Sequence, residues 1–148
     1  MGLDKKDFHH GAALVQMIEH PSFTSLNKAC SEYGHYLVNE DRRVFMHYAS
    51  NPRSPWKFQF TPTAIRAIEA DEGVEGQTYI ALICGDSGVC LLDTSELWEL
   101  LSSIPEDDEP QSVAVISPPR KQFEVRAGAI SLGTKVPRTR FPREVLEH

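Results

Sequence analysis

The sequence contains no long run of apolar residues. Apolar types make up 41% of the 148 residues, yet no stretch approaches the roughly 20 that a membrane-spanning helix needs. The first ten residues also lack the apolar segment of a secretory signal peptide. We therefore expect a soluble protein of the cytoplasm, without a membrane partner.

Cysteine is scarce as well, with three residues, Cys30, Cys84 and Cys90. An odd number in a chain without an export signal predicts free thiols rather than a disulfide framework. Cys84 and Cys90 flank an expected turn at Asp86–Ser87, where strand alternation would point their sulfurs to opposite faces. Because this spacing does not fit a zinc finger, we predict that both thiols pack in the core and that no cofactor is required.

Basic residues are concentrated in one part of a chain whose net charge is −6. Residues 120–143, which begin with Arg120, contain seven basic residues and the single acid Glu124. Acidic clusters lie elsewhere, at residues 69–75 and 106–109. This asymmetry argues against a protein that coats nucleic acid with its whole surface, and it predicts a basic arm at the C-terminal end.

The clearest structural pattern covers residues 78–101. Residues 79–84 form a short apolar run typical of a strand that is covered on both faces. Gly85 and Gly88 supply the backbone freedom that a hairpin reversal needs. Thr94 or Ser95 can begin a helix, so this stretch predicts a strand, a turn, a strand and a helix at the folding centre.

The remaining chain predicts a mixture of helices and short strands. A first helix from Asp4 or Asp7 to about Glu19 has an apolar stripe at helical spacing, which we expect to face inward: Phe8, Ala12, Val15 and Ile18. A second helix begins at Pro62 and ends at Gly73, with Ile65 and Ile68 inward. The expected strands cover residues 34–39, 44–50, 56–60, 112–117 and 122–126.

These elements predict the α+β class: a single domain with a mixed, largely antiparallel sheet, about three helices packed on it and an extended C-terminal arm. We expect residues 1–128 to form the domain and residues 129–145 to form the basic arm. Residues 146–148 resemble the start of a vector-derived tail.

The order helix, three strands, helix, strand over residues 7–84 resembles the restriction-endonuclease-like fold of PD-(D/E)xK nucleases. In that family, acids and a lysine hold a divalent metal and activate water. The resemblance implies Glu19, Asp41 and Lys57 as the matching catalytic residues, with a divalent metal as the cofactor. Pro55 replaces the acid two positions before Lys57, so the resemblance implies a catalytically degenerate relative.

Basic and aromatic residues favour an association with nucleic acid or with a complex that handles it. Arginine and lysine bind phosphates, and aromatic rings stack on bases; the candidates are Arg42, Arg43, Arg53, Lys57, Arg138 and Arg140. The alternation of Trp56, Phe58 and Phe60 favours burial of these rings in the core.

The alternative function is a protein-interaction module, for example a homodimer through the arm. A metal-dependent hydrolase is the third.

Histidines and serine offer no complete catalytic motif. Among five histidines before residue 48, only His35 and His47 lie in neighbouring strands where they might face each other. Two ligands do not make a metal site, so we interpret them as structural. Ser87 lies between strands and not at a strand-to-helix elbow, so no serine nucleophile is predicted.

Overall fold

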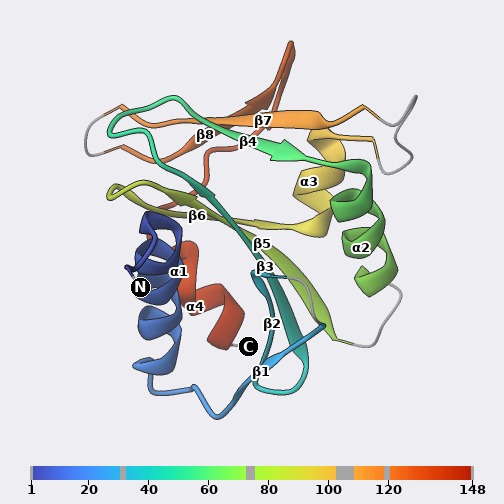
Figure 1. The fold of residues 1–148 in the computed structure, drawn as a ribbon. Helices are drawn as coiled ribbons and strands as arrows, with labels where there is room; N and C mark the ends of the chain where they lie inside the picture. The colour runs from blue at the N-terminus through green and yellow to red at the C-terminus, as the bar shows by residue number, and fades with distance from the viewer. Residues whose placement is uncertain (1, 31–32, 73–75, 103–108, 119–120, 148) are drawn as a thin grey trace.

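A computed structural model describes residues 2–30, 33–72, 76–102, 109–118 and 121–147. These residues form two sheets, and Figure 1 shows one above the other. The five-stranded sheet has the order β1-β2-β3-β5-β6 and the four-stranded sheet the order β4-β7-β8-β9, with antiparallel neighbours everywhere except between β3 and β5. The α+β class with largely antiparallel strands is confirmed, and the strands are divided between two sheets.

The helices are α1 (Lys5–Ile18), α2 (Pro62–Glu72), α3 (Thr94–Leu100) and α4 (Arg140–Leu146). The strands are β1 (Leu26–Lys28), β2 (His35–Val38), β3 (Arg42–Ala49), β4 (Trp56–Phe60), β5 (Gln77–Cys84), β6 (Gly88–Asp93), β7 (Gln111–Ile116), β8 (Glu124–Ala127) and β9 (Ile130–Ser131). Three positions used in the sequence predictions, Gly73, Arg120 and His148, lie outside the described residues. No helix in the described ranges is long and apolar enough to cross a membrane.

The β5–β6 hairpin is the centre of the molecule, as predicted. Every residue of β5 after Gln77 is buried. The register was predicted wrongly, because three residues rather than two form the loop: Cys84 pairs with Gly88, and Cys90 pairs with Leu82. Gly85 and Gly88 have positive φ values of 52° and 141°, which permit this loop. The two cysteines therefore pack in the same core cluster and not on opposite faces, and neither is disulfide bonded.

The core has two parts, one on each face of the five-stranded sheet. The first lies between the two sheets and includes the three aromatic residues of β4, whose burial confirms the alternation seen in the sequence. The second lies beneath α1 and α4, where Met17 and Val145 pack against Leu91 and its neighbours. Figure 1 shows α1 and α4 on the side of this sheet that faces away from the other sheet.

Helix α1 presents the opposite face from the one that we predicted. Its buried residues are His10, Ala13 and Met17. The four residues of the expected inward stripe, Phe8, Ala12, Val15 and Ile18, are all exposed. Both faces carry apolar residues at helical spacing, and the sheet selects the one with the longer, more flexible Met17 side chain.

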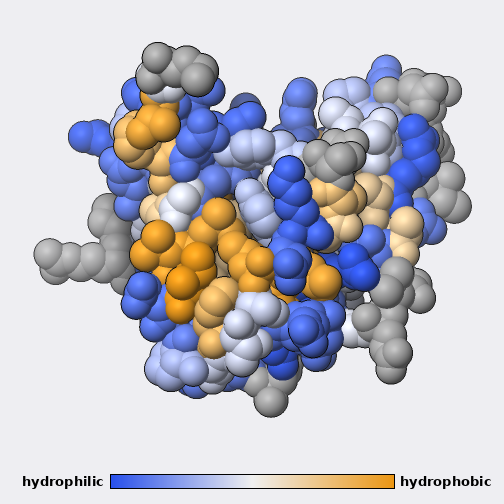
Figure 2. Space-filling view, turned by 60° about the horizontal axis from the view of Figure 1, so that its bottom comes forward, coloured by the Kyte–Doolittle hydropathy of each residue, from blue (hydrophilic) through white to orange (hydrophobic). Residues whose placement is uncertain are grey.

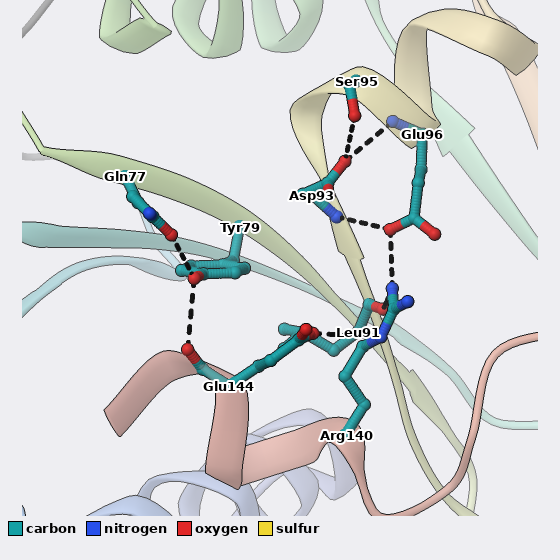
Figure 3. A network of polar contacts seen from close by, with 8 residues as sticks. All are labelled: Gln77, Tyr79, Leu91, Asp93, Ser95, Glu96, Arg140 and Glu144. Atoms are coloured by element: carbon teal, nitrogen blue, oxygen red, sulfur yellow. Dashed lines mark hydrogen bonds and ion pairs between the residues drawn. The ribbon is translucent and has the colours of Figure 1, made fainter. Parts of the chain in front are cut away.

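The C-terminal segment is folded onto its own domain. The residues expected to be an extended arm contain β9 and most of α4, and Phe141, Val145 and Leu146 are buried. Leu146 therefore belongs to the core and not to a tail. Polar contacts also hold α4, because Arg140 Nη1 lies 2.6 Å from Glu96 Oε1 and 3.1 Å from the Leu91 carbonyl oxygen (Figure 3).

Candidate functional site

The three residues implied by the nuclease resemblance come from separate parts of the fold. Glu19 follows α1, Asp41 lies in the β2–β3 turn, and Lys57 is on β4 in the other sheet. Asp41 pairs with the neighbouring Arg42, at 3.7 Å between Oδ1 and Nη1. Among the described residues, no group of three or more histidines, cysteines or acids could hold a metal ion. The structure therefore does not bring these residues together as a metal centre.

Besides Arg42, which pairs with Asp41, two more of the predicted nucleic-acid-binding arginines form ion pairs within the chain. Arg140 contacts Glu96, and its Nε lies 3.0 Å from Glu144 Oε2. Arg43 Nη1 lies 4.0 Å from Asp71 Oδ2. These partners leave the two side chains less available to phosphates.

Arg53 and Arg138, by contrast, line one cavity of about 620 Å³. Arg138 crosses between the two sheets: its Nε donates to the Lys121 carbonyl oxygen, and its Nη1 donates to Ser87. Its Nη2 also donates to Ser117 Oγ. A guanidinium has five donors, so one remains. Within the part of the chain that the structure describes, the cavity lining contains both arginines and no carboxylate.

A different constellation lies between the β1–β2 hairpin and α2. Cys30 Sγ is 3.0 Å from His35 Nδ1, and His35 Nε2 is 2.5 Å from Asp71 Oδ2. The His35 side chain is 6% exposed and that of Asp71 is 15% exposed, whereas Cys30 is only partly buried. A thiol, an imidazole and a carboxylate thus form a chain that runs from the surface into the protein.

The backbone explains why these residues meet. Cys30 and His35 lie at the two sides of the hairpin loop, which is closed by a 3.1 Å hydrogen bond from the Ala29 N–H to the His35 carbonyl. Gly34 has a φ of 81°, and a Cβ there would lie 2.8 Å from the Met46 carbonyl oxygen. Glycine therefore allows the loop to turn close against β3.

The imidazole and the carboxylate are each held by further contacts. The His35 ring stacks on Phe45, its partner in the β2–β3 pair, with 3.8 Å between centroids. Asp71 is in the last turn of α2, and its Oδ2 atom also lies 4.0 Å from Arg43 Nη1. His35 therefore does not face His47 across the strands, because its register partner is Phe45.

A cavity of about 220 Å³ adjoins His35. It is lined from the β1–β2 loop and from β2, β3 and the start of α2, by Tyr33, Gly34, His35, Phe45, Met46, His47, Thr61, Thr63, Ala64 and Ala67. Its lining is largely apolar with a few hydroxyl and imidazole groups. Such a composition is typical of a small-molecule site.

Two further histidines are held neutral: His47, which lines this cavity, and His10, which lies close to Gly34. Burial lowers the pKa of His47 to about 4, with a smaller effect from His10. Burial also lowers the pKa of His10 to about 4, and the nearby Lys6 acts in the same direction. His10 Nδ1 is buried without a hydrogen-bond partner. On the side of the cavity, the groups around His35 are uncharged imidazole, hydroxyl and apolar groups at neutral pH, and the charged neighbour of His35 is Asp71.

With Asp71 as a carboxylate, the two contacts of His35 define one direction of proton transfer. An ionised carboxylate accepts but cannot donate, so Nε2 of His35 donates to Asp71. Nδ1 then carries a lone pair and accepts from the Cys30 thiol. The thiol and the carboxylate occupy opposite ring nitrogens, which is unlike a metal site, where ligands converge on one point. A nucleophile, a base and a group that orients the base are thus arranged in sequence.

This site was missed by sequence reasoning. Thirty-six residues separate His35 from Asp71, and nothing in the chain marks the two as neighbours. The available signal was a cysteine and a histidine five residues apart around Gly34, in a polar stretch between strands. Histidine was interpreted as structural, and Cys30 was assigned no role beyond that of a free thiol.

Comparison with known proteins gives no match. No family model fits the sequence, and no curated protein or solved structure is significantly similar to it. The resemblance to PD-(D/E)xK nucleases therefore stays a prediction. A function must be argued from the geometry of the side chains.

Proposed function

We propose that the protein is a cysteine-dependent enzyme that transfers or hydrolyses a small acyl group. The observation that carries this proposal is the contact chain from Cys30 through His35 to Asp71, with distances of 3.0 and 2.5 Å. Thiol nucleophiles in proteins are activated by such an adjacent base, and a third group commonly orients the base.

The reaction follows from the roles of the three residues. His35 Nδ1 takes the thiol proton, and the Cys30 thiolate attacks the acyl carbon of an ester or thioester. The resulting imidazolium, stabilised by Asp71, then protonates the leaving alkoxide or thiolate as the acyl bond breaks. Water, deprotonated by His35, hydrolyses the acyl-cysteine and regenerates the thiol. A second nucleophile in place of water gives transfer.

The adjoining cavity restricts the substrate to a small group. Its volume of about 220 Å³ equals that of roughly seven water molecules in the liquid. Methyl and aromatic surfaces from Phe45, Met46 and Ala67 suit a short aliphatic acyl chain, and the threonines at 61 and 63 can accept or donate hydrogen bonds. A bulky or strongly charged acyl group does not fit this lining.

The competing interpretation is that these contacts only tie the hairpin to α2. Acylation of the protein with p-nitrophenyl acetate distinguishes the two, with intact mass, peptide mapping and nitrophenol release as readouts. We expect a single acetyl group on Cys30 and a burst of nitrophenol. Cys30→Ser should remove both, while Cys90, buried in the core, stays unmodified in the folded protein.

Two variants test the assigned roles. His35→Gln should slow acylation by at least about 100-fold, because the general base is lost. Asp71→Asn should slow it less, by about tenfold or more, because the asparagine still accepts from Nε2 but does not stabilise an imidazolium. Near-UV circular dichroism checks that each variant is folded. Equal acylation rates in the wild type and in folded His35→Gln would refute the enzymatic role and leave the structural one.

A second candidate function is the binding of nucleic acid or another phosphate ligand at the Arg53–Arg138 cavity. The supporting observation is that two guanidinium groups and three serine hydroxyls line it without a carboxylate. No contact within the described residues involves the Arg53 side chain, so Arg53→Ala should weaken binding of a short labelled oligonucleotide without loss of stability. Binding should also weaken steeply with salt. Lys28→Ala, at an exposed position of β1, serves as the control, and equal effects of both substitutions would contradict a specific site.

A further inference from the structure

The exposed face of α1 is apolar along much of its length. Phe8 is 59% exposed, Val15 is 56% exposed and Ile18 is 42% exposed. Single exposed apolar residues are common on proteins, but a contiguous group on one element marks an interaction surface. Figure 2 shows hydrophobic residues gathered on the side of the molecule where α1 and α4 lie.

The geometry points to a second copy of this chain as the partner, and we propose that α1 mediates a weak, reversible homodimer. Successive helical residues are 100° apart, which places Phe8, Val15 and Ala12 within about 60° of one another. The midpoint of this stripe is at Gly11–Ala12. An antiparallel copy about that midpoint places Phe8 of one helix against Val15 of the other, twice.

The centre of the stripe can admit a second helix. A Cβ added to Gly11 would meet no atom within 4 Å, so the body of the protein does not require glycine there. Glycine inside a helix costs about 1 kcal/mol relative to alanine. Close approach of another backbone is the usual reason for a small residue at such a position, and Ala12 is its neighbour across the midpoint.

The charges at the two ends of the stripe complement each other in the antiparallel arrangement. Lys5 and Glu19 are both exposed, and neither has an ion-pair partner among the described residues. They lie on the same flank of the Phe8–Val15 line. Two-fold symmetry places each Lys5 beside Glu19 of the other copy, whereas Asp4 lies on the opposite flank.

The size of the surface sets the strength of the dimer. A helix of 14 residues is about 21 Å long, and one such helix pair covers less than the roughly 800 Å² per partner of tight complexes. The dimer should therefore dissociate in the micromolar range. This inference is independent of the cysteine site, because α1 contributes none of its three residues.

Sedimentation equilibrium of the full chain, from low micromolar to about millimolar concentration, tests the proposal. The wild type should show a concentration-dependent rise toward twice the monomer mass. Val15→Glu should raise the dissociation constant at least tenfold. Ile130→Glu, which places the same charge at another exposed apolar residue on β9 (51% exposed), should leave the dissociation constant unchanged.

A charge exchange tests the antiparallel arrangement. Lys5→Glu or Glu19→Lys alone should weaken the dimer several-fold, and the double variant should restore it. Both changes favour the helix dipole of the monomer, so unfolding does not explain a loss. A wild type that stays monomeric throughout would overturn the proposal. An unchanged constant for Val15→Glu would overturn it equally, and failed rescue would refute the pairing of Lys5 with Glu19.

Discussion

Two hairpins of this protein carry its cysteines, and they differ in what surrounds the sulfur. In the β5–β6 hairpin, Cys84 and Cys90 are fully buried among apolar side chains. In the β1–β2 hairpin, Cys30 is partly exposed and lies against His35. Burial raises the pKa of Cys84 to about 12 and that of Cys90 well above its usual value. The same residue type is thus inert in the core and can be a nucleophile at the rim.

The largest expected effect is a difference in alkylation between the two hairpins. At pH 7, a thiol with a pKa of about 12 is ionised in roughly one molecule in 100,000. We expect iodoacetamide to modify Cys30 at least about 100-fold faster than Cys84 or Cys90 in the folded protein, measured by peptide mapping. Denaturant should abolish the difference. Equal alkylation rates of the three cysteines in the native protein would contradict the difference between the two hairpins.

Substitution of a leucine by alanine should lower the free energy of unfolding more in the β5–β6 hairpin than in the β1–β2 hairpin. Leu82 in β5 is fully buried, whereas Leu37 in β2 is only partly buried. Leu82→Ala should lower the free energy of unfolding by about 2–5 kcal/mol, and Leu37→Ala should lower it by about 1 kcal/mol or less. Urea denaturation measures both. Similar losses of unfolding free energy in the two variants would mean that the β1–β2 hairpin is part of the main core.

Acid should destabilise the side of the molecule that holds the β1–β2 hairpin. The pKa of His47 is about 4 in the folded protein and about 6.5 unfolded, so the unfolded state binds more protons between these values. The contribution of His47 to the free energy of unfolding is fully present above pH 6.5. It is lost as the pH falls toward 4, and the loss is roughly 3 kcal/mol.

His47→Phe should remove most of the decrease in unfolding free energy that His47 causes between pH 7 and pH 4. Urea denaturation at the two pH values measures this decrease. The remaining acid sensitivity should reflect His10, whose pKa is lowered in the same direction. Gln59→Ala, at an exposed and uncharged position of β4, is the control and should not change the profile. An unchanged profile in His47→Phe would show that this imidazole is not buried in its neutral form.

The smallest expected effect is the change in stability when the cap between the β5–β6 hairpin and α3 is removed. Asp93 ends β6 and caps α3, because its side chain accepts from the Glu96 N–H at 2.8 Å and its own N–H donates to Glu96 Oε1 at 3.0 Å. Asp93→Ala should cost about 1 kcal/mol. Ser95→Ala, which removes only an exposed hydroxyl contact, should cost less, and the reverse order would rule out the capping box as the main contribution.

Much of the fold was predictable because local patterns agree with the tertiary structure. The continuous apolar run of β5, the alternation Trp56-Lys57-Phe58 in β4 and the Thr61-Pro62 helix start each have one stable solution. Three errors had a common origin. The loop length of the β5–β6 hairpin, the inward face of α1 and the fold of residues 129–145 all depend on which surface is available to pack against.

The candidate site was less predictable than the fold. Cys30 and His35 lie in a polar stretch without periodicity, and Asp71 was visible only as one acid in an acidic cluster. Arg43 and Arg138 were predicted to bind nucleic acid because of their charge. That charge gave no indication that Arg43 contacts Asp71 or that Arg138 donates to Ser87 and Ser117. Pairing between distant residues leaves no trace in a single sequence.

The sequence by itself determined where the strands and helices lie, apart from β1, β9 and α4, and which hairpin forms the interior, because hydrophobic periodicity and turn residues act over a few neighbouring positions. Only the tertiary structure decided which side of α1 meets the sheet and which thiol meets an imidazole. Those outcomes depend on contacts between segments that are far apart in the chain. Burial of the whole molecule, rather than any local preference, selects among them.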